Sequence, residues 1–333
     1  MYRLEIVCCH LDEAGICAGD RIDYWEELER NGAACLYSTP SFHQLHYQFT
    51  ERLVLVLFVD TNTRPLALLV GGISKGQLRF PYSAPFARIE FEDATTLETR
   101  QACYRQLPAI ARFLGTDSMQ ITLPPASYFG NDESVVYSAL LNAGLQITYC
   151  DTSNRLDLAR FATRDKFLAA AHHSVRKNFK KANRDGLSFC RLQAGEFLRA
   201  YDVIAINRRE RELPLRIARE QMQRIFSGLT SFVDCFLVRS GERDVAAAII
   251  YRVTARIRQV IYWGSLSEFN AAGCMAMLVA GLFETYREDG ETQLLDIGPS
   301  SEHGEVNFPL LQFKLRNNCA SEPKYSFSWV AES

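Results

Sequence analysis

The strongest constraint on the fold is that one order of predicted elements occurs twice along the 333 residues. In each half the residue pattern predicts a helix, a β-hairpin, a third strand, a helix, a strand, a helix and a last strand. The two hairpins align at an offset of 179 residues, 59–67 with 238–246. Few residues are identical, so the order of elements carries the interpretation of an internal duplication. Two unrelated domains of similar order are the alternative.

Hydrophobic periodicity and turn residues predict the individual elements. In the first half we predict strands at residues 2–9, 53–60, 65–71, 77–80, 119–123 and 145–150, and helices at 24–30, 41–49, 97–114 and 133–142. In the second half we predict strands at 188–192, 231–239, 245–253, 257–264, 293–297 and 324–330, and helices at 172–186, 195–211, 217–226, 270–288 and 306–317.

The connections define the fold class. Antiparallel hairpins come first in each half, and strand 257–264 reaches strand 293–297 through a long helix, which makes one parallel crossover. That helix, with Asn270 as its predicted N-cap, carries one apolar stripe. The stripe consists of Met275, Leu278, Val279, Leu282, Phe283 and Tyr286. We therefore predict an α+β fold, with a mixed β-sheet and flanking helices, in two domains at 1–155 and 156–333.

Composition excludes several classes of protein. The net charge of -2 and the pI of about 6.3 argue against nucleic-acid binding through a global basic field. There is no run of about 18 apolar residues for a membrane span and no signal-peptide pattern, so a cytoplasmic location is expected. The ten cysteines form no C-x-x-C pair and are interpreted as reduced, mostly buried thiols. Cys8, Cys9 and His10 would alternate faces on a strand, so no metal site is predicted.

Three local motifs lie in a fixed order over about 250 residues. The first is Phe80-Pro81-Tyr82-Ser83-Ala84-Pro85-Phe86, and the second is the basic segment 172–182. The third is Leu295-Asp296-Ile297-Gly298-Pro299-Ser300, followed by Asn307 and Phe313-Lys314. In this order the motifs resemble those of the tandem-GNAT, FemAB-like acetyltransferases. The resemblance implies two tandem GNAT-like (acyl-CoA N-acyltransferase) domains, of which the first is degenerate.

The same resemblance implies transfer of an acyl or aminoacyl group to an amine, often in cell-envelope biosynthesis. Acyl-CoA, such as acetyl-CoA, would be a co-substrate rather than a bound cofactor, and the acceptor would be a small-molecule or a nucleotide- or lipid-linked amine. The chain lacks an R-x-x-G-x-G loop before residue 270, which weakens the case for CoA. It also lacks a long coiled-coil insertion, which weakens the case for an aminoacyl-tRNA donor. The donor therefore stays open.

The donor site is expected at the start of the long helix and at the strand before it. The N-terminal end of a helix attracts phosphate, and Gly273 would allow close approach of the backbone. Packing alone is the alternative explanation for Gly273. In this fold the third strand parts from its parallel neighbour, which leaves backbone groups free for the acyl arm. The expected donor-binding residues are Trp263, Gly264, Ser265, Asn270, Gly273 and Gly298.

Two catalytic residues are expected. Asp296 at a strand end could position the amine or accept its proton, and a carboxylate that caps the following turn is the alternative. By resemblance, Lys314 would stabilise the negative charge that develops on the acyl oxygen, and a solvated lysine on an amphipathic helix is the alternative.

The acceptor is expected near the basic helix and the first motif. Arg176 has the planar fork that suits a diphosphate, whereas a solvated charged face is the alternative for the whole helix. The expected acceptor-binding residues are Tyr82, Ser83, Arg176, Lys177, Lys180 and Asn307. Residues 207–211 are interpreted as surface ion pairs, with a substrate role as the alternative. The leading hypothesis is an N-acyltransferase, and a non-catalytic binding module of the same fold is its rival.

Overall fold

The computed structural model describes residues 3–11, 15–31 and 34–331. The chain divides into two compact units. Unit 1 consists of Met1–Thr152, His303–Glu305 and Glu322–Ser333, and unit 2 consists of Ser153–Glu302 and Val306–Ser321. The domains expected from the sequence, 1–155 and 156–333, are continuous stretches, whereas the last residues of the chain pack in unit 1. Residues 1–2 of the first stretch and residues 332–333 of the second lie outside the described residues.

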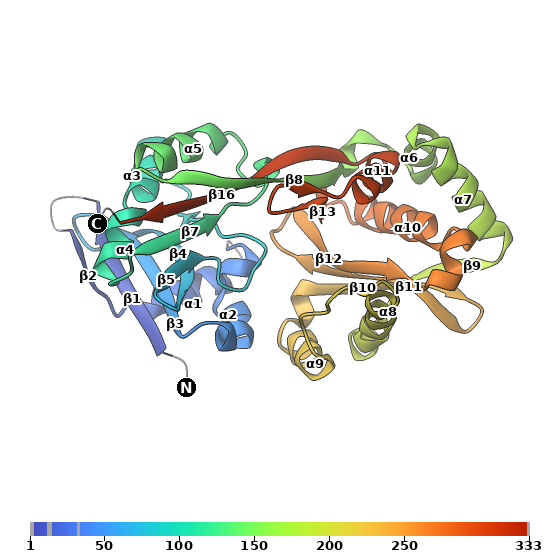
Figure 1. Cartoon of the computed structure of the whole chain (residues 1–333), viewed down its shortest axis with the longest axis horizontal. Helices are drawn as coiled ribbons and strands as arrows, with labels where there is room; N and C mark the ends of the chain where they lie inside the picture. The colour runs from blue at the N-terminus through green and yellow to red at the C-terminus, as the bar shows by residue number, and fades with distance from the viewer. Residues whose placement is uncertain (1–2, 12–14, 32–33, 332–333) are drawn as a thin grey trace. The chain divides into compact units, whose positions relative to one another are not determined.

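Unit 1 is a mixed sheet with helices on both faces (Figure 1). The sheet order is β2-β1-β3-β4-β5-β7-β16. Its strands are β1 (Arg3–His10), β2 (Ile16–Ala18), β3 (Arg52–Val59), β4 (Pro65–Ser74), β5 (Gln77–Phe80), β6 (Glu90–Phe91, paired with β4), β7 (Ser118–Thr122) and β16 (Ala320–Val330). Its helices are α1 (Ile22–Arg30), α2 (Pro40–His46), α3 (Leu97–Arg105), α4 (Leu107–Phe113) and α5 (Glu133–Asn142).

The continuous apolar run of β3 reflects its burial on both faces. Val54, Val56 and Phe58 belong to one core cluster, while Leu53 and Leu55 belong to another on the opposite face of the sheet. Successive side chains of a strand point to opposite faces, so only a strand covered on both sides can be apolar throughout. The run therefore marks β3 as an interior strand of unit 1.

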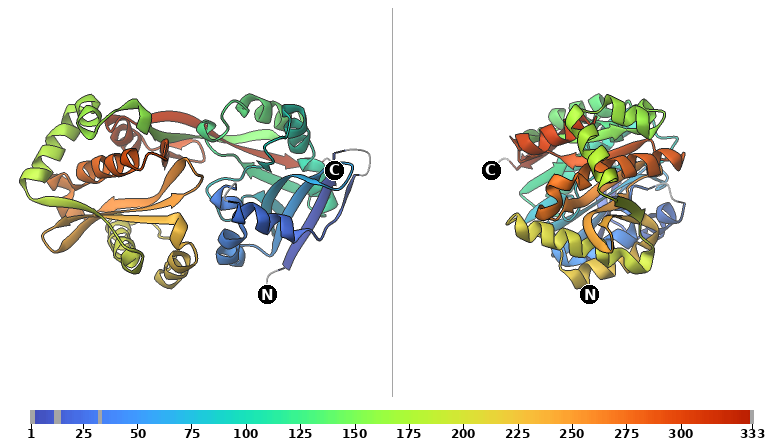
Figure 2. Two further views of the ribbon diagram at one scale, coloured as in Figure 1. Left: turned by 180° about the vertical axis from the view of Figure 1, so that it is seen from behind. Right: turned by 90° about the vertical axis from the view of Figure 1, so that its right-hand side faces the viewer.

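Unit 2 repeats this plan with the sheet order β8-β13-β12-β11-β10-β9. Helices α8 and α9 lie on one face, and α10 and α11 lie on the other (Figures 1 and 2). Its strands are β8 (Gln146–Asp157), β9 (Leu187–Arg191), β10 (Val233–Ser240), β11 (Arg243–Arg252), β12 (Ile257–Ser265) and β13 (Leu294–Pro299), with a small ribbon of β14 (Ser301–Glu302) and β15 (Glu305–Val306). Its helices are α6 (Arg164–Ala170), α7 (His173–Arg184), α8 (Phe197–Glu210), α9 (Arg219–Gly228), α10 (Cys274–Glu288) and α11 (Phe308–Arg316).

Two strands have residues in both units. β8 passes from unit 1 to unit 2 after Thr152, and its second part pairs antiparallel with β13, with Leu294 opposite Asp157. β16 returns the other way and pairs antiparallel with β7, with Phe327 opposite Ile121. The strand next to β13 therefore comes from the end of the first half of the sequence, and the C-terminal strand completes unit 1.

Three helices differ from the sequence expectation. The helix expected at 97–114 is two helices that meet at Gln106, because Pro108 can occupy only the first turn of a helix. α10 begins at Cys274, preceded by a 3-10 turn (Ser267–Ala272), so its N-cap is Gly273 and not Asn270. α6 was not predicted.

Helix α10 is buried on more than its predicted stripe. Ala276, Met277 and Ala280 are also buried, because α7 packs on the outer side of α10 through Val175. Gly281 lies directly over the ring of Phe189, where an added Cβ would come within 2.4 Å of the ring. A single stripe would suit a helix with one free face, whereas α10 lies between the sheet and a second layer of helix.

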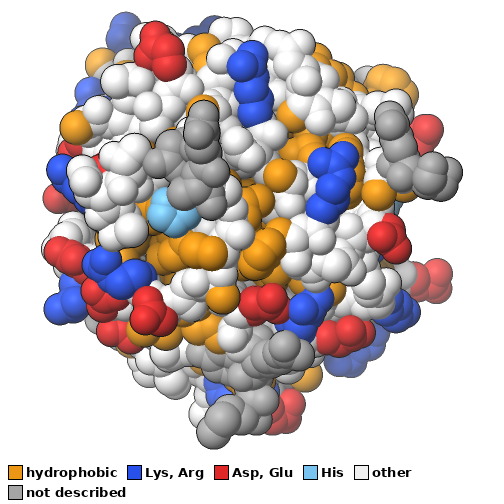
Figure 3. Space-filling view, turned by 90° about the vertical axis from the view of Figure 1, so that its left-hand side faces the viewer, with side chains coloured by type: hydrophobic (Ala, Val, Ile, Leu, Met, Phe, Trp, Pro, Cys, Tyr) orange, Lys and Arg blue, Asp and Glu red, His pale blue; other side chains and the backbone are white. Residues whose placement is uncertain are grey.

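Seen from the side of β1 and β2, the surface of unit 1 shows acidic and basic side chains interspersed around apolar ones (Figure 3).

None of the helices within the described residues is long and apolar enough to cross a membrane. Within the same residues no group of three or more His, Cys, Asp or Glu side chains could hold a metal ion.

Candidate active site in unit 2

The central feature of unit 2 is the point where its two parallel strands part. β12 and β13 pair only from Ile257 opposite Leu294 to Gln259 opposite Asp296. Beyond this point each strand keeps only its outer neighbour, β11 for β12 and β8 for β13. Backbone groups of both strands therefore face an opening that widens toward their carboxyl ends, which is where ligands bind in open sheets of this kind.

A backbone irregularity lies on each side of the opening. Ile249 pairs with Tyr262 and Ile250 with Val260, so Ile261 is an extra residue in β12. A matching register shift leaves Ile297 without an opposite residue in β13. Bulges of this kind bend a strand and redirect its side chains. Together they explain why the strands separate after only three pairs.

Asp296 maintains the turn at the end of β13. Its Oδ1 accepts a hydrogen bond of 2.7 Å from the Gly298 N–H, and its Oδ2 accepts one of 2.6 Å from the Gln259 side chain. Gly298 has φ of 74°, a backbone conformation that favours glycine. The turn-capping alternative for Asp296 is therefore what the structure shows, and a role for this buried carboxylate in proton transfer stays a prediction.

Lys314 on α11 is buried beside the same turn. Its side chain is 1% exposed, and its ammonium donates to the carbonyl oxygens of Gly298 and Pro299, each at 2.8 Å. Burial lowers the pKa of Lys314 to about 8. The alternative of a solvated lysine is therefore wrong. An ammonium has three donors, so one remains beyond the two carbonyls.

Trp263 closes the α11 side of the opening. Its ring packs edge to face on Phe313, with ring centres 5.6 Å apart. Phe313 precedes Lys314, so the Phe-Lys pair of the third motif places an aromatic ring at the end of β12 and a cation at the end of β13. The structure thus brings together Trp263, Asp296, Gly298 and Lys314, which the sequence placed far apart.

The other expected donor residues connect β12 to α10. The Ser265 hydroxyl donates to Asn270 Oδ1 at 2.9 Å, which makes Asn270 a turn residue rather than a cap. Gly264 lies against the side chain of Asn207 on α8, where an added Cβ would come within 2.4 Å of the amide oxygen. Asn207 is buried and donates to the Ser265 carbonyl at 2.7 Å. Sequence reasoning placed Asn207 among surface ion pairs and missed this role.

Helix α7 lies against the start of α10. An added Cβ at Gly273 would come within 2.2 Å of the Asn178 carbonyl oxygen, so Gly273 permits this close contact. Lys181 donates to the Ala271 carbonyl at 2.7 Å. The packing alternative for Gly273 is therefore what the structure shows, and binding of a donor phosphate at the same place stays a prediction.

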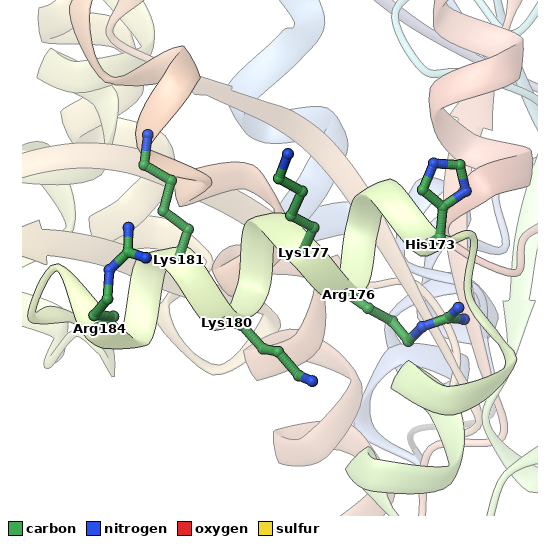
Figure 4. Close-up of a pocket in the computed structure, with 6 residues that line it drawn as sticks. All are labelled: His173, Arg176, Lys177, Lys180, Lys181 and Arg184. Atoms are coloured by element: carbon green, nitrogen blue, oxygen red, sulfur yellow. The ribbon is translucent and has the colours of Figure 1, made fainter.

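Arg176, Lys177, Lys180, Lys181 and Arg184 line an open region on the surface of α7. Figure 4 shows that they leave the helix in different directions rather than converging on one point. Arg176, the expected diphosphate ligand, donates to the Ala169 and Ala171 carbonyls and so caps α6. Lys177 and Lys180 are exposed, as the solvated-face alternative requires. His172 caps α7 by accepting from the Ser174 N–H.

The remaining expected acceptor residues have structural partners. Asn307 caps α11 by accepting from the Leu310 N–H at 3.1 Å. In unit 1 Tyr82 pairs with His43, whose Nδ1 lies 2.8 Å from the Tyr82 hydroxyl and whose Nε2 lies 2.9 Å from the Tyr37 carbonyl. A carbonyl only accepts, so Nε2 carries the proton and the tyrosine donates to Nδ1. Burial lowers the pKa of His43 to about 3, which keeps the ring neutral. Ser83 is half-buried in the same loop.

Unit 1 differs from unit 2 at the equivalent strands. β5 and β7 pair over the full length of β5, up to Phe80 opposite Ile121. The chain then returns, and the Ala87 N–H donates to the Thr122 carbonyl at 2.9 Å. Backbone from the first motif thus occupies the place that is open in unit 2, which favours unit 2 as the site of chemistry.

Comparison with known proteins supports the fold but not a closer relationship. No family model matches the chain, and no curated protein matches its sequence. A crystal structure of FemX aligns with a TM-score of 0.64 at 11% identity, covering 88% of this chain and 91% of FemX. A tandem GNAT protein from the clavulanic acid biosynthesis pathway aligns with a TM-score of 0.51 at 13% identity, covering 94% of this chain and 97% of that one. The chain has the tandem-GNAT fold.

A further solved structure extends this similarity. The structure of L-PGS from Bacillus licheniformis aligns with a TM-score of 0.58 at 12% identity, over 92% of this chain and 90% of that protein. The expected α+β class and the resemblance to FemAB-like tandem-GNAT proteins are thus confirmed at the level of the fold. Within the tandem-GNAT fold, the β12–β13 opening of unit 2 is the strand separation that the resemblance led us to expect.

Proposed function

We propose that the chain is an N-acyltransferase that joins an acyl group to an amine at the β12–β13 opening of unit 2. The observation that carries this proposal is the early parting of two parallel strands around a buried lysine, after Gln259 and Asp296. The free backbone groups of both strands can hold an extended acyl arm, and in this proposal the remaining donor of Lys314 binds the carbonyl oxygen as it becomes charged. The fold shared with FemX and with a tandem GNAT protein supports the same class of reaction.

The reaction needs neither a metal nor a covalent intermediate with the protein. The amine nitrogen attacks the acyl carbon, the carbonyl oxygen gains negative charge, and the remaining donor of Lys314 stabilises that charge. The bond to the leaving sulfur or oxygen then breaks, and the proton of the amine goes to the leaving group. Holding the amine against the acyl carbon supplies the rest of the rate enhancement.

Two classes of acyl donor are candidates, a CoA thioester and an aminoacyl-tRNA. A CoA thioester would place its diphosphate near the start of α10. There Lys181 of α7 binds the Ala271 carbonyl, and the Asn178 carbonyl of α7 lies against Gly273. An aminoacyl-tRNA would instead meet the exposed cations of α7, including Lys177 and Lys180. The absence of the glycine-rich loop favours the second donor or the rival reading, a GNAT-fold binding module without catalysis.

Thermal unfolding in the presence of donors tests the proposal first. Acetyl-CoA, longer acyl-CoAs, free CoA and an aminoacyl-tRNA are added separately, because a ligand that binds only the folded chain raises its Tm. Lys314→Ala is compared with Arg316→Ala, which removes an exposed cation from the same helix. A shift with one donor class identifies the donor, and no shift with any of them favours the binding module.

A further inference from the structure

The β12–β13 opening has a second face, on the side of α8. Trp263 points toward α11, so its neighbour Tyr262 points through the sheet to the opposite side. There the guanidinium carbon of Arg208 lies 5.7 Å from the centre of the Tyr262 ring. Tyr262 and Arg208 therefore lie on the sheet face opposite to that of Trp263 and α11.

Arg208 lacks the partner that a buried guanidinium needs. Its side chain is half-buried, and its Nε is fully buried without a hydrogen-bond partner in the described part of the chain. No ion pair of Arg208 is found among those residues either, in contrast to the neighbouring Arg219, which binds Asp202 through two bonds of 2.8 and 3.0 Å. A half-buried arginine without an ion pair can bind an acidic ligand without first giving up another partner.

A second cation lies near the same ring. Burial raises the pKa of Tyr262, and the positive charges of Arg208 and Arg216 act in the opposite direction. The ion contact of Arg216, with Glu302 at 3.8 Å, joins two side chains that are 81% and 78% exposed. Such contacts contribute little, so Arg216 can turn toward a ligand at small cost.

The surroundings of these two arginines are fixed in place. Tyr201 on α8 donates to the Ile217 carbonyl at 2.8 Å and so anchors the connection from α8 to α9. Asn207, the residue before Arg208, is tied to the Ser265 carbonyl of β12. Arg208 is thus held over the Tyr262 ring, and the exposed Arg216 can add a second cation when a carboxylate or a phosphate binds.

We propose that Arg208, with Tyr262 and Arg216, binds an acidic group of the acceptor, so that the acceptor is an amine that also carries a carboxylate or a phosphate. This inference rests on the proposed acyl transfer for the identity of the ligand as acceptor. The binding itself requires no donor and no turnover.

The first experiment measures binding alone. Four amines are used as probes, in two pairs: β-alanine with β-alaninamide, and O-phosphoethanolamine with ethanolamine. The second of each pair is called the neutral counterpart because the group that replaces the acid is uncharged. The protein carries ¹⁵N in its arginines, and the Nε–H signal of Arg208 is assigned by its loss in Arg208→Gln. We expect one acidic amine to shift this signal saturably and its neutral counterpart to leave it unchanged. Equal shifts with both members of each pair, or none with any probe, would overturn the inference.

Variants separate this site from general charge. Arg209→Gln removes the same charge from the next position of α8, where the side chain is exposed, and should leave binding of the acidic amine intact. Arg216→Gln should weaken it. Arg216 is exposed, so this variant keeps the test informative if Arg208→Gln does not fold. Loss of binding in Arg209→Gln to the same extent as in Arg216→Gln would overturn the inference.

The second experiment measures turnover with whichever donor is active. We expect the acidic member of one pair to have a kcat/KM about 10- to 100-fold above its neutral counterpart, the usual range for a charged hydrogen bond. The preference should fall to near unity in Arg208→Gln. Transfer without any preference would overturn this inference and leave the proposed function standing. Binding of the acidic probe without transfer would support the inference and count against the proposed function.

Discussion

At the residue scale, the ends of β12 and β13 are held by three side chains from different parts of the sequence. Asp296 caps the Gly298 turn, Lys314 binds the two carbonyls that follow it, and Asn207 binds the Ser265 carbonyl opposite. Each bond satisfies a backbone group that lost its ladder partner where the strands parted. Side-chain hydrogen bonds therefore hold the backbone where the pairing of β12 with β13 ends.

The buried charge of Lys314 makes stability depend on pH. The folded pKa of about 8 lies below the ordinary value of 10.5, so between these values the unfolded chain binds more protons than the folded one. The free energy of unfolding should therefore rise with pH across this window, relative to Lys314→Met, by at most about 1.4 kcal/mol per pH unit. Urea unfolding of both proteins from pH 7 to 10 measures the difference. If the difference in the free energy of unfolding between the two proteins does not change with pH, burial does not lower the pKa of Lys314.

Gly264 provides a test of the contact between β12 and α8. Gly264→Ala places a methyl group within 2.4 Å of the Asn207 amide, so we expect a loss of about 1–3 kcal/mol in the free energy of unfolding. Gly195→Ala is the control, because an added Cβ there meets open space. Chemical denaturation measures both. Equal effects of the two substitutions would contradict the close contact.

At the element scale, α10 is defined by what covers it. The sequence pattern predicted a helix with one stripe, and the structure adds α7 on the outer side, where the Gly273 αL position lets the Asn178 carbonyl approach. This contact fixes the start of α10 and places the cationic side chains of α7 beside it.

Substitution of Gly273 separates strain from contact. Gly273→Ala introduces both an unfavourable φ of 83° and a Cβ 2.2 Å from the Asn178 oxygen, whereas Gly290→Ala introduces an unfavourable φ of 71° in open space. We expect Gly290→Ala to cost about 1 kcal/mol and Gly273→Ala clearly more. Amide hydrogen exchange should also be faster in α7 in the Gly273 variant alone. Unchanged exchange in α7 would contradict the packing of α7 on α10.

Sequence patterns predicted most elements because periodicity and turn residues are local. The helix at 133–142 was predicted with the bounds that the structure has, and the strand pattern of 77–80 likewise. The break at Gln106 was missed because Pro108 is compatible with a helix start, and α6 was missed because its seven residues span fewer than two turns. The partners of Arg176 and Lys314 depend on tertiary contacts, which no local pattern contains.

At the scale of the whole molecule, the two halves of the sequence exchange their last strands. The pattern at 324–330 predicts a strand but says nothing about its partner, and the structure pairs it with β7 of unit 1. Phe327 is fully buried in the core of unit 1, although Val306–Ser321 before it belongs to unit 2. The expected boundary near residue 155 stays close to the crossing of β8 at Thr152.

The exchange has a measurable consequence. Phe327→Ala removes a large side chain from the core of unit 1, so we expect a loss of about 3–5 kcal/mol there. Hydrogen exchange should become faster in β3 and β7, and β10 should be affected less. Phe236→Ala is the matched control, because Phe236 is equally buried in unit 2. A Phe327 variant that loosens β10 first would contradict the assignment of β16 to unit 1.

The account depends most on acyl transfer at the β12–β13 opening. The most direct measurement is transfer of a radiolabelled acyl group, from acetyl-CoA or from an aminoacyl-tRNA, to a panel of amines that includes acidic ones. We expect transfer from one donor class by the wild-type chain and by Arg316→Met, and a loss of about 100-fold or more in Lys314→Met, the usual effect of removing one oxyanion donor. No transfer from either donor class, or wild-type rates in Lys314→Met, would contradict the account.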